Sequence, residues 1–143
     1  MSEIVAGILT YEHIRQVFNI IEECTDDYLY VLDFKYDIGA VSKNAAEKFA
    51  FPDTHFENAS AVIKDICHPD DYEMLWKNLS GIVEGREMRH DMEYRWIDKE
   101  GRFLWIHCQG YVVRDEGKKA RYLLGVITEL GRKNVIDNLT GLY

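Results

Sequence analysis

Two pairs of adjacent carboxylates, Asp26–Asp27 and Asp70–Asp71, are the residues of this chain best suited by type to act as a general acid and base. Such catalysis requires further polar groups that converge on the same reacting atom, and the sequence shows none beside either pair. Asp70 and Asp71 also follow Pro69 at the start of a predicted helix, where negative charge stabilises the positive end of the helix dipole. We therefore expect no catalytic residues and no enzymatic activity in this chain.

Cysteine and histidine stand next to each other twice, at 67–68 and at 107–108, which raises the question of a metal site. Adjacent residues in a strand point to opposite faces, so His107 and Cys108 cannot easily bind one ion. The ligand spacings of zinc sites, such as CxxC, do not occur, and neither does a glycine-rich loop that could hold phosphate. We expect no metal, and we interpret His68 as the cap of the helix that begins at Pro69.

Composition limits the class of protein and its partners. The chain has 143 residues, enough for one domain, and a net charge of −8, which repels the phosphate backbone of nucleic acid. No apolar run is long enough to span a membrane, and the first residues lack the features of a signal peptide. The 3 cysteines are odd in number and form no pattern, which fits a reduced, cytoplasmic location.

The N-terminal part predicts an amphipathic helix over roughly 11–24. Thr10 suits the N-cap position, and apolar residues then recur at helical spacing, among them Ile14, Phe18 and Ile21. Two interpretations remain open for the apolar stripe. The helix either covers the core of its own domain or pairs with a second subunit.

The remaining elements predict an α+β fold, with one five-stranded antiparallel sheet and helices on one face. Aromatic and branched residues after position 25 predict a strand and a hairpin, followed by short helices and mixed helical turns over 53–67. The clearest element is a long helix that begins at Pro69 and ends at Gly85. Three strands follow, over roughly 90–97, 102–114 and 120–130.

Alternation along the strands predicts which side chains face inward. The predicted inward, cavity-lining set is Tyr30, Leu32, Tyr94, Trp96, Ile106, Cys108, Leu123 and Ile127. These residues either fill the core at normal density or leave an apolar pocket with polar tips. The opposite face of the middle strand is large and amphipathic, so that a helix or a second subunit should partly cover it. The predicted interface set is Ile14, Phe18, Ile21, Trp105, His107 and Tyr111.

Residues 25–130 resemble a PAS domain, and in particular the subtype whose long helix opens with H-P-D-D and whose next strand carries E-Y-R. Here these motifs are His68–Asp71 and Glu93–Arg95, followed by the turns "DKEGRFLWI" and "RDEGK" and the strand end "GVIT". The resemblance implies a sensory domain that can hold flavin, haem or a metabolite. The Asn-Cys-Arg-Phe motif of the photoactive flavin subtype is missing, and the long helix has no histidine within it for haem. A small organic ligand of unknown identity fits the resemblance better.

The last residues, "DNLTGLY", resemble the start of a GGDEF domain, which typically begins D-x-L-T-G-L; Asp137, Leu139, Thr140, Gly141 and Leu142 carry this motif. GGDEF domains condense two GTP molecules into cyclic di-GMP. The resemblance implies the sensor of a diguanylate cyclase, cut just past the join, with an N-terminal helix at 1–24, a PAS domain at 25–130, and a linker with the first GGDEF residues at 131–143. One departure is Val126, which stands where such joins usually carry the Asp of an Asp-Ile-Thr motif.

Three functions remain open at this point. The first is a homodimeric sensory module that sets how two GGDEF domains meet, with Thr128, Glu129, Arg132 and Asp137 transmitting the signal. The second is a ligand-free interaction domain. The third is a small pocket enzyme of the ketosteroid-isomerase type, which would need an inward carboxylate beside a tyrosine. Glu93 and Tyr94 are adjacent on a strand and point oppositely, which argues against the third function.

Overall fold

The computed structural model describes residues 10–130, and Arg132 and Asp137 therefore lie outside the described residues, as do the GGDEF-like residues. Along the chain the elements are α1 (Tyr11–Ile21), a 3-10 turn (Glu22–Cys24), β1 (Tyr28–Asp33), β2 (Ile38–Val41), α2 (Lys43–Lys48), β3 (His55–Glu57), α3 (Ala59–Ile66), α4 (Pro69–Glu84), β4 (Arg89–Ile97), β5 (Phe103–Arg114) and β6 (Ala120–Glu129). The predicted α+β class is confirmed. The predicted N-terminal helix is α-helical to Ile21 and tightens into the 3-10 turn at its end.

The strands form one antiparallel sheet in the order β3-β2-β1-β6-β5-β4. The sheet has 6 strands where the sequence predicted five, and the additional strand is β3 at the edge beside β2. Its Phe56 is buried and stacks on Phe51, with ring centroids 5.3 Å apart. Gly39 on β2 leaves room for that ring, since a Cβ there would approach Phe56 to 2.6 Å. Helical turns were predicted for these residues. The packing of the Phe56 side chain favours a strand instead.

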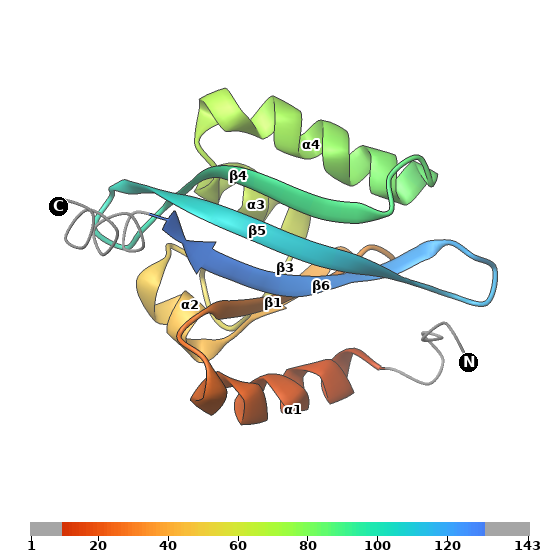
Figure 1. Cartoon of the computed structure of the whole chain (residues 1–143), viewed down its shortest axis with the longest axis horizontal. Coiled ribbons are helices and arrows are strands. Elements are labelled where there is room, and N and C mark those ends of the chain that lie inside the picture. The colour runs from red at the N-terminus through yellow and green to blue at the C-terminus, as the bar shows by residue number, and fades with distance from the viewer. Residues whose placement is uncertain (1–9, 131–143) are drawn as a thin grey trace, which may run out of the picture.

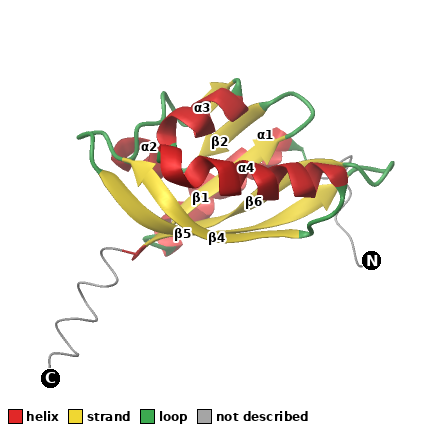
Figure 2. Ribbon diagram, turned by 90° about the horizontal axis from the view of Figure 1, so that it is seen from above, coloured by secondary structure: helices red, strands yellow, loops and turns green. Residues whose placement is uncertain are grey.

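Helices cover both faces of the sheet (Figures 1 and 2). α2, α3 and α4 lie on one face and enclose the main core, whereas α1 lies on the other face, which we call the outer face. A second, smaller core joins α1 to the outer face; its buried members are Ile14, Phe18, Leu29, Val31, Ala40, Val113 and Tyr122. The N-terminal helix thus covers its own domain, which was one of the two open interpretations.

The ends of α4 follow the local signals in the sequence. His68 is the N-cap, and its Nδ1 accepts a hydrogen bond from the backbone N–H of Asp70 at 3.0 Å. Pro69 occupies the first turn, where its missing N–H costs nothing. Gly85 ends the helix with a φ of 85°, in the left-handed region that glycine adopts without strain.

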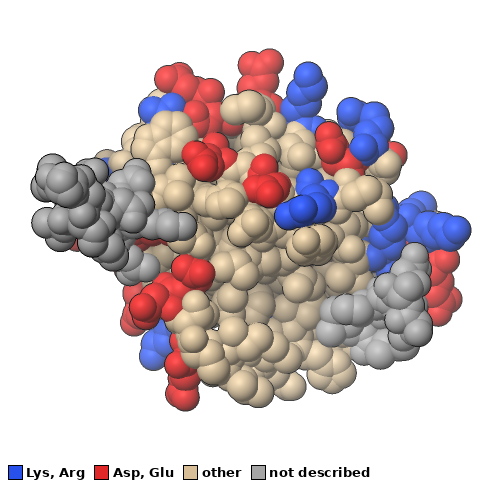
Figure 3. Space-filling model, viewed as in Figure 1, with Lys and Arg blue, Asp and Glu red and all other residues tan. Residues whose placement is uncertain are grey.

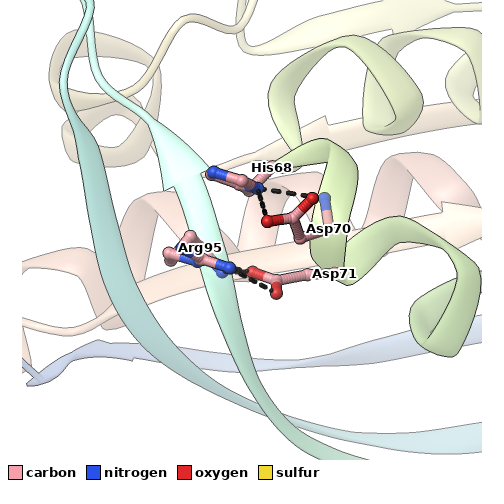
Figure 4. Close-up of polar contacts among 4 residues, drawn as sticks. All are labelled: His68, Asp70, Asp71 and Arg95. Carbon is pink, nitrogen blue, oxygen red and sulfur yellow. Dashed lines mark hydrogen bonds and ion pairs between the residues drawn. The ribbon is translucent and has the colours of Figure 1, made fainter.

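An ion pair anchors this helix to the sheet (Figure 4). Asp71 Oδ2 accepts from the backbone N–H and from Nε of Arg95, both at 2.9 Å, and Asp71 Oδ1 accepts from Arg95 Nη2 at 2.9 Å. The Arg95 guanidinium, through these side-chain hydrogen bonds, lowers the pKa of the Asp71 carboxyl. The same guanidinium lies over the Trp105 ring on β5, 4.7 Å from its centroid. The H-P-D-D and E-Y-R motifs are therefore two halves of one contact between α4 and β4.

Loss of this ion pair should destabilise the fold. Asp71 is buried and Arg95 half-buried, so Asp71→Asn leaves a guanidinium without its partner and should lower the free energy of unfolding by about 2–3 kcal/mol. Asp70→Asn is the matched control, since it makes the same change one residue earlier on an exposed side chain, and it should cost less than about 1 kcal/mol. Urea denaturation of both variants measures the difference, and equal losses would contradict the anchoring role.

Candidate functional site: a closed core chamber and an open sheet face

The inward faces of the strands meet beneath α4 around a small chamber of about 30 Å³. The predicted residues that line it are Tyr30, Leu32, Tyr94, Trp96, Cys108 and Leu123. Ile106 and Ile127, which were also predicted to line a cavity, are fully buried in the surrounding core and do not reach the chamber. A space of this size holds about one water molecule, so the inward side chains largely fill the core.

His90 is a chamber residue that was missed in the sequence. It lies on β4, where residues two apart share a face, and the alternation that places Tyr94 and Trp96 inward also places His90 inward. The other lining residues that were not predicted come from several elements: Ala40, Val41, Phe51, Phe56, Ile63, Leu75 and Leu79. They belong to β2, β3, α3, α4 and a connecting segment, whose approach to the sheet depends on tertiary packing.

His90 forms the centre of a buried hydrogen-bonded chain. Its Nδ1 lies 2.7 Å from Asn78 Oδ1 on α4, and its Nε2 lies 2.8 Å from the Tyr94 hydroxyl. Because the amide oxygen can only accept, Nδ1 carries the proton, and Nε2 accepts from Tyr94. Burial lowers the pKa of His90 to about 4, while nearby Asp91 acts in the opposite direction. The His90 imidazole is therefore neutral in the folded protein at neutral pH.

Two further polar groups face the chamber, and neither has an oxygen or nitrogen partner in the described part of the protein. They are the Tyr30 hydroxyl and the Trp96 indole N–H, and both side chains are 5 % exposed. The Cys108 thiol lies beside the Tyr30 and Tyr94 hydroxyls, and burial raises its pKa to about 12, so it stays protonated and unreactive. A guest in the chamber could accept a hydrogen bond from either donor, but the volume limits that guest to the size of water.

The lining of the chamber lacks the acidic side chain that a pocket enzyme of the third kind would need. None of its lining residues is an aspartate or glutamate, so the carboxylate that a ketosteroid-isomerase type of site would need is not in place. Within residues 10–130, no group of three or more His, Cys, Asp and Glu side chains is arranged to hold a metal ion.

The outer face of the sheet is open beyond the area that α1 covers. Trp105 and Tyr111 on β5 are 47 % and 60 % exposed, and each carries an arginine over its ring: Arg95 over Trp105, and Arg89 over Tyr111 at 4.9 Å. His107 lies between them, with Nε2 2.6 Å from Asp91 Oδ1. Figure 3 shows that charged side chains gather toward the upper part and the sides of this view, while its centre, over the strands, carries few.

The predicted interface residues on α1 divide into two groups. Ile14 and Phe18 are buried against the chain's own sheet and are therefore not available to a partner in this arrangement. Ile21 is partly exposed, and Val17 and Ile20 present a further apolar surface on the solvent side of the helix. Val17 lies three residues after Ile14, so helical spacing places it at the edge of the same apolar stripe, whereas Ile20 lies outside that stripe; neither was among the predicted interface residues.

Two predicted transmission residues, Thr128 and Glu129, lie at the end of β6 on opposite faces of the sheet. Glu129 is 9 % exposed, and its Oε1 accepts a hydrogen bond from the Tyr28 hydroxyl at 2.8 Å. Thr128 is half-buried and stands opposite His107 on the outer face. Tyr28 also packs edge-on against Phe49 at 5.2 Å, and Phe49 against Trp96 at 5.5 Å. A continuous row of aromatic rings therefore joins the chamber to the last residue of the sheet.

Comparison with known proteins identifies the family. A family model described as the PAS fold matches residues 41–127, which is more than half of the chain, and the chain belongs to this family. It is a PAS domain, and a PAS domain alone is not an enzyme. A search of curated proteins by sequence gives no significant match. No helix within the described range is both long and apolar enough to cross a membrane.

Solved structures with the same fold come from signalling proteins. A sensory box histidine kinase/response regulator from Burkholderia thailandensis E264 aligns with a TM-score of 0.64 at 20% identity, over 86% of this chain and 92% of that one. The N-terminal domain of a diguanylate cyclase with PAS/PAC sensor from Marinobacter aquaeolei gives 0.62 at 17%, over 76% and 99%. A PAS domain from Colwellia psychrerythraea gives 0.61 at 16%, over 81% and 96%. At these identities the likeness establishes the fold alone.

The buried imidazole should make stability depend on pH. The unfolded chain binds a proton at His90 near pH 6.5, whereas the folded chain does so only near pH 4, so stability is complete above 6.5 and falls as the pH drops through this window. The loss should reach about 3 kcal/mol. Urea denaturation between pH 7.5 and 4 should show this slope in the wild type and in the control His13→Gln, which changes an exposed histidine on α1. His90→Gln should flatten it, and an unchanged slope in that variant would refute the assignment.

Proposed function

We propose that this chain is a cytoplasmic sensory and dimerising module that regulates a diguanylate cyclase domain following it in a longer protein. The observation that carries the proposal is the position of the GGDEF-like residues 137–143, a few residues after the last strand of a PAS sheet. Because the reaction joins two GTP molecules, it requires two cyclase sites facing each other. A homodimer of the PAS module would set that geometry, and a ligand would act by favouring one arrangement of the dimer over another.

The contacts at the end of β6 support a route for the signal. Glu129 is the last residue of that strand and is held by Tyr28, which starts β1 directly after the N-terminal helix and turn. A shift of the rings around Trp96 and Phe49 would therefore reach the point where the chain leaves the sheet. Arg132 and Asp137 would carry it onward into the cyclase.

A second candidate is a ligand-free interaction domain. The specific observation that favours it is the chamber volume of about 30 Å³, which excludes flavin, haem and any metabolite from the core as it stands. In that case the module would pair subunits or bind another protein without a switch. The two candidates share the interaction surface and differ in whether a ligand binds and switches the arrangement of the subunits.

Removal of the Tyr28 hydroxyl should alter cyclase regulation without unfolding the domain. In the longer protein, Tyr28→Phe frees Glu129 and should change the rate of cyclic di-GMP formation at least about threefold, which corresponds to a modest coupling energy. Tyr11→Phe is the matched control, since it removes a similar hydrogen bond, 2.8 Å to His55 Nδ1, far from the exit of β6. Equal rates of cyclic di-GMP formation in both variants and the wild type would show that Glu129 does not transmit the signal.

The outer face should form the subunit interface. Trp105→Glu places a charge on it and should weaken self-association at least about tenfold, or about 1.4 kcal/mol. Trp76→Glu makes the same change on α4, on the other side of the sheet, at a tryptophan with nearly the same exposure of 48 %, and it should leave self-association unchanged. Analytical ultracentrifugation measures both, and a wild type that remains monomeric at high micromolar concentration would refute the interface.

A further inference from the structure

A second hollow, mostly apolar and with an aromatic wall, lies outside the core chamber. It is a groove of about 370 Å³ that α3, α4 and the β1–β2 turn form together. Its volume falls within the range of small-molecule sites, whereas the core chamber is about ten times smaller. The groove does not coincide with the predicted cavity, since Leu32 is the one residue of the predicted inward set that lines it.

The two spaces share a wall. Leu32, Ile63 and Leu79 line both the groove and the core chamber, so one layer of aliphatic side chains separates them. A molecule seated in the groove would press on the same leucine and isoleucine side chains that pack around the chamber. The same chamber is lined by Trp96, where the aromatic row that leads to Glu129 begins.

The outer rim of the groove is aromatic. Tyr72 and Trp76, one turn apart on α4, stack with their centroids 6.2 Å apart and their planes at 23°. Trp76 is half-exposed and can still receive a flat ring or a cation on its open surface. Lys64 Nζ already stands 5.8 Å from the centroid of the Tyr72 ring, so a guest would stack chiefly on Trp76.

The charged side chains that line the groove are all acidic, although three basic side chains stand close by. The ionisable carboxylates that line it are Asp33, Asp37 and Glu84, and no lysine or arginine lines it. Arg121 neutralises Asp33 through two bonds of 2.9 and 3.1 Å, and Arg86 pairs with Glu84. Asp37 instead accepts from the backbone N–H and the hydroxyl of Ser60, and among the described residues it has no ion pair with a lysine or arginine. The end of the groove at Asp37 should therefore favour a cationic guest over an anionic one.

We propose that this groove is a binding site for a small aromatic cation, which stacks on Trp76 and places its positive charge toward Asp37. The inference rests on the proposed function, because it supplies the ligand site that the closed core lacks. It differs from that function in what it requires, since binding to the groove needs neither a dimer nor a cyclase domain.

Three probes with one ring system and different charges test the site. Tryptamine is a cation, indole is neutral, and indole-3-acetate is an anion. Titration into the 143-residue chain, followed by NMR shifts of the Trp76 indole N–H and the Ile63 and Leu79 methyl groups, should give the tightest binding for tryptamine. We expect at least fivefold weaker binding of indole-3-acetate. Equal binding of the three probes, or shifts confined to His90 and its neighbours, would overturn the proposal.

A matched pair of variants on α4 locates the site. Trp76→Ala removes the stacking surface and should weaken tryptamine binding at least fivefold. Met74→Ala changes another exposed apolar residue of the same helix, which does not line the groove, and it should bind tryptamine as the wild type does. Unchanged binding by Trp76→Ala would overturn the proposal even if tryptamine binds elsewhere.

The outcomes also separate this site from the proposed function. If tryptamine fails to bind the isolated chain while the longer protein forms cyclic di-GMP under control of this module, the groove proposal alone is overturned. If tryptamine binds with the expected loss in Trp76→Ala and the longer protein forms no cyclic di-GMP, the groove proposal stands and the cyclase proposal is overturned.

Discussion

The ion pair between Asp71 and Arg95 is the contact on which the rest of the structure depends. It fixes the first turn of α4 to β4, and α4 in turn closes the core chamber and forms one wall of the groove. The same arginine lies over Trp105 on the outer face, so one side chain connects the helical layer, the sheet and the surface that we assign to the dimer. Because this pair is mostly withdrawn from water, either partner alone would be costly to the fold.

A closed core changes how a sensor of this family could work here. Tyr30, Tyr94, Trp96 and His90 bring polar atoms into the chamber, yet the rings themselves take up the volume that a metabolite would need. A signal would then enter at the groove or at the outer face. The wall that the groove and the chamber share and the aromatic row toward Glu129 provide a packed connection from the groove to the end of β6.

Local signals predicted most of the fold. Pro69 and Gly85 delimit α4, and strand alternation placed all eight inward residues on the core side, because capping and the strand period act within a few residues. The features that could not be predicted from the sequence depend on contacts between distant segments. Phe56 makes β3 a strand through Phe51 and Gly39, and Asp71 looked like a helix-start residue because its partner lies 24 positions away. The groove was not predicted for the same reason, since its lining residues come from separate elements.

The central claim is that this module sets the geometry of two cyclase domains. It is tested most directly by the cyclic di-GMP that the longer protein forms before and after residues 1–130 are replaced by a parallel dimeric coiled coil, with plain deletion as the comparison. The account predicts that deletion abolishes most of the activity and that the coiled coil, joined in a suitable register, restores it without the native regulation. Full activity after deletion, or no cyclic di-GMP from the intact protein, would contradict it.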